Sequence, residues 1–71
     1  MAIERSPVQS SNVKSIGYDP DEKTLAVEFA DGSIYHYHGV EKVVHEELLS
    51  TKSVGKYLHA NIKGAYKHAK Q

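Results

Sequence analysis

Residues 24–38 read TLAVEFADGSIYHYH, and this stretch decides the fold. Residues 24–29 alternate between apolar and other side chains, which is the period of a strand with one buried face. Residues 34–38 are rich in tyrosine and histidine and follow an Asp31-Gly32 turn, so the two runs predict a β-hairpin. We expect a three-residue loop in this hairpin, with Gly32 in the left-handed conformation that only glycine adopts cheaply.

The register of the hairpin decides where the tyrosines point. A two-residue turn would place Tyr35 opposite Glu28 and expose it, whereas the three-residue loop pairs Tyr35 with Val27 and Tyr37 with Leu25. We favour the second register, because it collects the large side chains on one face. That face would hold Leu25, Val27, Phe29, Tyr35 and Tyr37, and the solvent face would hold Ala26, Glu28, His36 and His38.

The flanking segments predict a small domain of mixed structure. Residues 12–18 contain β-branched and aromatic side chains and end at an Asp-Pro turn, which indicates a first strand. Residues 41–49 indicate a short helix, and Ser53 can cap a second one. The expected fold class is α+β: a three-stranded antiparallel β-meander followed by two helices (β-β-β-α-α). We expect a flexible lead-in over residues 1–9, the domain over residues 10–66 and a C-terminal tail over residues 67–71.

The helix after Ser53 is predicted to be amphipathic and basic. Its apolar stripe would be formed by Val54, Leu58, Ile62, Ala65 and Ala69. The opposite side would carry Lys56, His59, Lys63, Lys67 and Lys70, and docking of the stripe on the core would turn these lysines outward. Gly64 weakens the helix and offers a point for its regular part to end.

Length and charge limit the possible functions. A chain of 71 residues buries one small core and leaves no room for a deep catalytic cleft. The net charge is zero, but residues 1–47 carry four basic and nine acidic side chains, whereas residues 48–71 carry five lysines and no acid. This asymmetry indicates an anionic partner for the C-terminal part, although neutralisation between the two halves explains it equally well.

Several other classes of function are not expected. The first residues carry charge and proline, and no apolar stretch approaches the roughly 18 residues of a membrane span, so we expect a cytoplasmic protein. The chain has no cysteine. His36 and His38 have a spacing that could hold a metal, with His45 or His59 completing it, but no recognisable motif follows and no tight zinc site is predicted. The glycines are dispersed, and no serine has a triad pattern, so no cofactor and no catalytic residue is expected.

An ordered set of residues resembles the KTSC domain family. The set runs through Leu25-x-Val27-x-Phe29, Gly32, Tyr35-x-Tyr37 and Ser53-x-Gly55-x-Tyr57 to Ile62 and Tyr66. This short bacterial and phage domain has a central YxY motif and occurs alone or at the C-terminus of some lysyl-tRNA synthetases. The resemblance implies no catalytic residues, and RNA binding is suggested by the attachment to the synthetase. The chain departs from the family in lacking proline after Val40 and an aromatic-asparagine pair at Leu58-His59.

Two hypotheses follow from these patterns. The first is a small non-enzymatic module that binds RNA or tRNA, with lysines on phosphates and an exposed tyrosine stacked on a base. Its candidate residues are Lys52, Lys56, Lys63 and Lys67, with Tyr18, Tyr35 and Tyr37. Tyrosines that only fill the core are the competing interpretation. The second hypothesis is a protein-interaction or regulatory domain that uses a sheet edge or the helix face, with weak self-association through an open edge.

Overall fold

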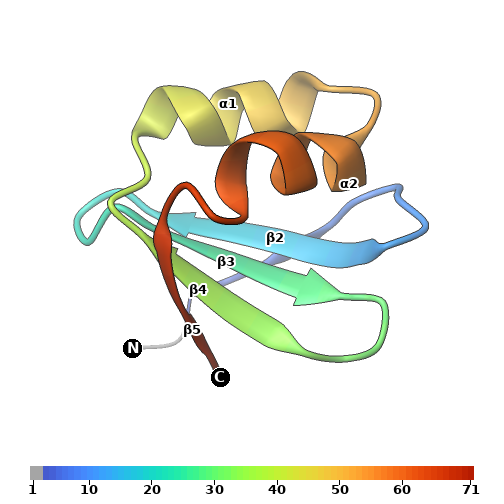
Figure 1. The fold of residues 1–71 in the computed structure, drawn as a ribbon, viewed down its shortest axis with the longest axis horizontal. Coiled ribbons are helices and arrows are strands. Elements are labelled where there is room, and N and C mark those ends of the chain that lie inside the picture. The colour runs from blue at the N-terminus through green and yellow to red at the C-terminus, as the bar shows by residue number, and fades with distance from the viewer. Residues whose placement is uncertain (1–2) are drawn as a thin grey trace.

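The computed structural model describes residues 3–71 and confirms the α+β class (Figure 1). An antiparallel sheet of five strands has the order β1-β2-β3-β4-β5. The strands are β1 (Ser6–Pro7), β2 (Val13–Asp19), β3 (Thr24–Phe29), β4 (Ile34–His38) and β5 (Lys67–Lys70). The helices α1 (Lys42–Ser50), α2 (Val54–Tyr57) and η1 (Leu58–Ile62), a turn of π-helix that continues α2, lie over one face of the sheet.

The β3–β4 hairpin has the predicted register. Tyr35 lies opposite Val27, and Tyr37 lies opposite Leu25. The loop is closed by a hydrogen bond of 2.8 Å from the Phe29 amide to the Ser33 carbonyl, and Gly32 has a φ of 92°. Because this conformation strains any residue with a Cβ atom, the loop accounts for glycine at this position.

The hydrophobic core lies between the helices and one face of the sheet. Tyr37 is only 2% exposed and packs there with the apolar residues of β3, while Tyr35 is half-buried against the same cluster. The prediction that both tyrosines face the helices is therefore confirmed. Val54, Leu58 and Ile62 are buried in this core, which confirms the first part of the predicted apolar stripe.

The predicted number of strands is wrong, because the sheet has a further strand on each side. Ser6, within the expected lead-in, pairs with Ile16, and β5, within the expected tail, pairs with β4. The two-residue β1 is too short to show a periodic pattern. The sequence of β5, KHAK, contains no β-branched residue and no Phe, Tyr or Trp, so tertiary pairing with the open edge of β4 selects the strand against local propensity.

The last helix ends close to Gly64, the point that the sequence offered, and does not continue through Ala65 and Ala69. It ends at Ile62, where the Lys63 amide donates a hydrogen bond of 2.8 Å to the Leu58 carbonyl. Gly64 then adopts a φ of 82°, and the chain turns back toward β4. Ala65 and Ala69 are consequently exposed, so the predicted extension of the apolar stripe through them is wrong.

The second face of the sheet is less exposed than predicted. Ala26 is fully buried, because the segment 3–5 crosses this face so closely that a Cβ atom at Gly17 would overlap the Glu4 carbonyl. Arg5 Nε donates a hydrogen bond of 3.2 Å to Ser15 Oγ, which in turn donates one of 3.0 Å to Glu28 Oε1. The expectation of a wet face is thus wrong for Ala26.

Candidate nucleic-acid interface

Three of the four predicted lysines line adjoining grooves. Lys52 and Lys56 line a groove of about 230 Å³, and Lys56 and Lys63 line the next, of about 570 Å³, together with His59. Asn12 lines both grooves, so the two are continuous. We call this surface, formed by Asn12, Lys52, Lys56, His59 and Lys63, the basic groove. All three lysines are exposed, as predicted for Lys56 and Lys63.

The basic groove leads into a third depression of about 600 Å³ that also includes Asn12 and Lys63. Its aromatic lining consists of Phe29, Tyr35, Tyr37 and His68, and we call it the aromatic groove. The ring centroids of Phe29 and Tyr35 lie 5.6 Å apart, edge to face, and those of Tyr35 and Tyr37 lie 6.4 Å apart. His68 reaches the same cluster from β5, at 5.7 Å from Tyr35.

Lys63 joins the two grooves. Its Nζ atom lies 4.8 Å from the centroid of the Phe29 ring. An ammonium group at this distance is attracted by the negative face of the ring. Because η1 ends at Ile62, Lys63 stands at the first position after the helix and reaches across to the end of β3.

The aromatic groove also has a polar rim. Asp31 and Ser33, from the β3–β4 loop, line it. Asp31 Oδ1 accepts hydrogen bonds from the Ser33 amide (2.9 Å) and the Ser33 hydroxyl (2.6 Å). These hydrogen bonds hold the pKa of the Asp31 carboxyl below its usual value, so the group is ionised at neutral pH.

Lys67 is separated from the other predicted lysines. It lies on β5 opposite His38, whereas His68 and Lys70 lie opposite Tyr37 and Tyr35. Because side chains alternate between the two faces of a strand, Lys67 belongs to the sheet face that points away from the helices. The prediction that Lys67 shares a helix face with Lys63 is wrong, because the helix ends at Ile62 and Lys67 begins β5.

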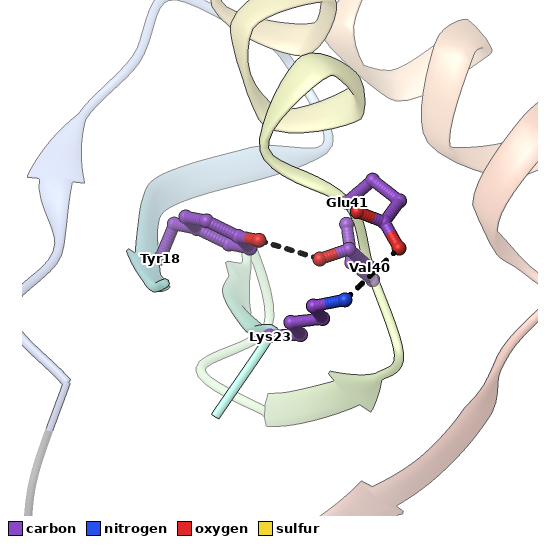
Figure 2. Close-up of polar contacts among 4 residues, drawn as sticks. All are labelled: Tyr18, Lys23, Val40 and Glu41. Carbon is purple, nitrogen blue, oxygen red and sulfur yellow. Dashed lines mark hydrogen bonds and ion pairs between the residues drawn. The ribbon is translucent and has the colours of Figure 1, made fainter. Parts of the chain in front are cut away.

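Of the three candidate tyrosines, one is buried and one is held by other contacts away from the lysines. Tyr37 is 2% exposed, and this burial raises its pKa. The Tyr18 ring stacks on the ring of His45 at 4.9 Å, and its hydroxyl donates a hydrogen bond of 2.5 Å to the Val40 carbonyl (Figure 2). Tyr18 and Tyr35 are both partly exposed. The depression that Tyr18 lines contains none of the candidate lysines, whereas the aromatic groove places Tyr35 beside Lys63.

Tyr18 belongs to a polar contact that fixes the start of α1. Figure 2 shows Tyr18 pointing at the Val40 carbonyl, beside an ion pair of 3.3 Å between Lys23 and Glu41. The Val40 amide also donates a hydrogen bond of 2.9 Å to the Lys23 carbonyl. The turn between β2 and β3 is therefore tied to the junction between β4 and α1, and the role of Tyr18 in the structure is to hold that junction.

Comparison with known proteins identifies the family. The KTSC domain profile matches residues 9–66. The chain belongs to the KTSC domain family. The crystal structure of a KTSC domain protein from Yersinia pestis superimposes with a TM-score of 0.95 at 38% identity, over 99% of each chain. The resemblance inferred from the ordered motifs is confirmed.

Other proteins similar to this chain differ in the share of their length that it matches. An uncharacterized protein from Stutzerimonas stutzeri is 39% identical over 57 residues, which cover 80% of each chain. A lysine–tRNA ligase from a Nostoc species is 43% identical over 60 residues, which are 84% of this chain and 11% of the ligase. The KTSC domain thus matches a small part of that ligase.

The YxY motif of this KTSC domain has two distinct roles. Tyr37 is packed in the core, and Tyr35 forms the wall of the aromatic groove. Phe29, Asp31, Asn12 and His68 were not among the predicted site residues. The β3 pattern and the hairpin place Phe29 and Asp31 near Tyr35, so these two could have been found, whereas His68 depends on the unpredicted β5.

The histidines do not converge in the part of the KTSC domain that the structure describes. His36 and His38 lie on the second face of the sheet, His45 stacks on Tyr18, and His59 lines the basic groove. Burial, followed by the charges of His38 and Arg5, lowers the pKa of His36. Within residues 3–71, no group of three or more histidine, aspartate or glutamate side chains is arranged to hold a metal ion. No helix in this range is long and apolar enough to cross a membrane.

Proposed function

We propose that this KTSC domain is a small non-enzymatic module that binds single-stranded RNA in the cytoplasm of a bacterium or a phage-infected cell. One observation carries the proposal: Lys52, Lys56 and Lys63 line a basic groove that runs into an aromatic groove walled by Tyr35. Lysines along a groove bind successive phosphates by releasing counterions, and an aromatic wall stacks unpaired bases.

The relatives support the choice of RNA. Lysine–tRNA ligases carry a segment similar to this chain, and their substrate is tRNA. We therefore propose the unpaired loops and ends of tRNA as a natural target. Duplex RNA is a poorer fit, since a paired base offers no free face to Tyr35.

The test is a salt-dependent titration with labelled single-stranded RNA, tRNA and duplex DNA. A Lys56→Gln, Lys63→Gln double variant removes two charges from the grooves. A Lys42→Gln, Lys67→Gln double variant removes two charges elsewhere, because neither lysine lines any of the three grooves. We expect the slope of log-affinity against log-salt to fall in magnitude by about 1.4 for the first variant, which is about 0.7 for each phosphate contact with a single strand. The slope of the control variant should be unchanged.

Two results would contradict this function. One is no binding to any RNA at low salt, and the other is the same slope for both variants. Either result would indicate that the lysines are ordinary exposed residues that do not bind RNA. It would favour a protein-interaction domain that uses the β5 edge or the helix face. The exposed β5 carries Lys67 and Lys70, and lysine on an edge strand opposes pairing with another chain, so we place RNA first.

A further inference from the structure

The Phe29 ring has a face that is covered by a displaceable group. The Lys63 ammonium lies 4.8 Å from its centroid, and the Lys63 side chain is exposed. A lysine side chain is long and flexible, so the ammonium can leave the ring without any change in the backbone. A base that stacks on Phe29 would take its place, and the released ammonium would be free to bind the neighbouring phosphate.

The aromatic groove is large enough to hold one base. At about 600 Å³ the groove lies within the usual range for small-molecule sites, about 300 to 1,000 Å³. Tyr35 stands edge to face with Phe29, at 5.6 Å between centroids, and closes the side of the groove. These rings provide stacking, which every base accepts, and so they do not discriminate between bases.

Asp31 supplies the discriminating group. In the described part of the chain its hydrogen bonds with Ser33 all use Oδ1, which leaves Oδ2 for a ligand. An ionised carboxylate only accepts hydrogen bonds, and it repels phosphates and carbonyl oxygens. The edge of a base that meets Asp31 must therefore present donors.

Guanine meets this requirement best. Its Watson–Crick edge carries two adjacent donors, N1–H and the N2 amino group, and the two lone pairs of Asp31 Oδ2 can accept both. Adenine and cytosine each present one amino donor beside a ring nitrogen that is an acceptor, and uracil presents one N–H between two carbonyls. Proteins commonly read such edges in single-stranded RNA.

We propose that the aromatic groove binds one unpaired guanine, stacked on Phe29 and hydrogen-bonded through its N1–H and N2 amino group to Asp31, with Lys63 moved onto the adjacent phosphate. This inference rests on the proposed RNA-binding function and adds base specificity to it. The Lys70 charge lies near enough to Asp31 to favour its ionised form, which keeps the acceptor available.

The test compares pentanucleotides that differ only in the central base: UUGUU, UUIUU, UUAUU, UUCUU and UUUUU. The native protein should bind UUGUU about five-fold more tightly than UUAUU. This is the low end of the range for a base contact with two hydrogen bonds, because both bonds share Oδ2 and Asp31 is exposed. Inosine keeps N1–H and lacks the amino group, so UUIUU should fall between the two. Equal affinities for all five would overturn the guanine assignment.

Two variants locate the source of the preference. Asp31→Asn keeps a side-chain oxygen for Ser33, so the loop is retained, but it replaces the acceptor-only carboxylate. We expect the preference for guanine to fall below two-fold and the affinity for UUAUU to be unchanged or higher, because a negative charge is removed. Asp21→Asn, which lies outside the aromatic groove, should leave the preference intact.

Retention of the preference by Asp31→Asn would overturn the role of Asp31. Salt-dependent binding without base preference would leave the RNA-binding function standing, whereas no binding to any pentanucleotide or to tRNA would remove both.

Discussion

The two faces of the sheet are covered to different extents and by different means. On the helix side, Leu25, Val27 and Tyr37 pack against apolar side chains of α1, α2 and η1. On the other side, Ser15 and Ala26 are covered by the backbone and polar groups of the segment 3–5. The burial of large apolar side chains stabilises the helix face. On the second face the backbone of the segment 3–5 can lie close to the sheet, because the sheet residues beneath it are small. Substitutions should therefore act differently on the two faces.

The largest effect is expected on the helix face. Leu58 is 1% exposed in the core, so Leu58→Ala should leave a cavity and lower the free energy of unfolding by about 3 kcal/mol. Leu49 is 54% exposed, and Leu49→Ala should change the free energy of unfolding by less than about 0.5 kcal/mol. Urea denaturation measures both variants. Similar losses for the two would show that the apolar core does not dominate the stability of this face.

A smaller and more local effect is expected on the second face. Gly17→Ala puts a methyl group where the Glu4 carbonyl lies, so the segment 3–5 must move, at about 1 to 3 kcal/mol. Amide hydrogen exchange should show loss of protection at Val8, whose amide donates a hydrogen bond to the Lys14 carbonyl just after β1, and at the β2 residues paired with β1, with β4 unchanged.

The control for this change is Gly55→Ala in α2. Its added Cβ atom would lie 3.3 Å from the Asn12 side-chain amide, which can give way, and alanine favours a helix over glycine by up to about 1 kcal/mol. The stability of this variant should be equal to or above that of the native protein. If Gly17→Ala were equally well tolerated, the close cover of the second face would be disproved.

The contrast between the faces also explains what could be predicted from the sequence. Alternation in residues 24–29 and the Asp31-Gly32 turn predict the β3–β4 hairpin and its buried face, because both signals are local. The cover of the second face depends on β1 and the segment 3–5, whose residues show no period. The groove was predicted in part: Lys56, Lys63 and Tyr35 could be named from helical spacing and strand alternation. His68 could not be named, since β5 is selected by pairing with β4 and not by its own sequence.

The smallest effect concerns a polar contact at the margin of the helix face, where Tyr18 lies opposite Leu25. Tyr18→Phe keeps the ring beside His45 and removes the hydrogen bond to the Val40 carbonyl, so the free energy of unfolding should fall by about 1 kcal/mol at pH 7.

Burial, followed by the charge of Glu41, raises the pKa of Tyr18 above its ordinary value of 10.0. A group whose pKa is higher in the folded state stabilises the protein fully below its unfolded pKa and loses this contribution as the pH rises through the folded pKa. The difference in stability between the native protein and Tyr18→Phe should therefore be constant from neutral pH to about pH 9 and should narrow above about pH 10. The raised pKa values of Tyr37 and Tyr57 affect both proteins alike and cancel in this difference. A difference that stayed constant through the alkaline range would show that the Tyr18 hydroxyl ionises as freely in the folded protein as in the unfolded chain, which would contradict a hydrogen bond donated by this hydroxyl to the Val40 carbonyl.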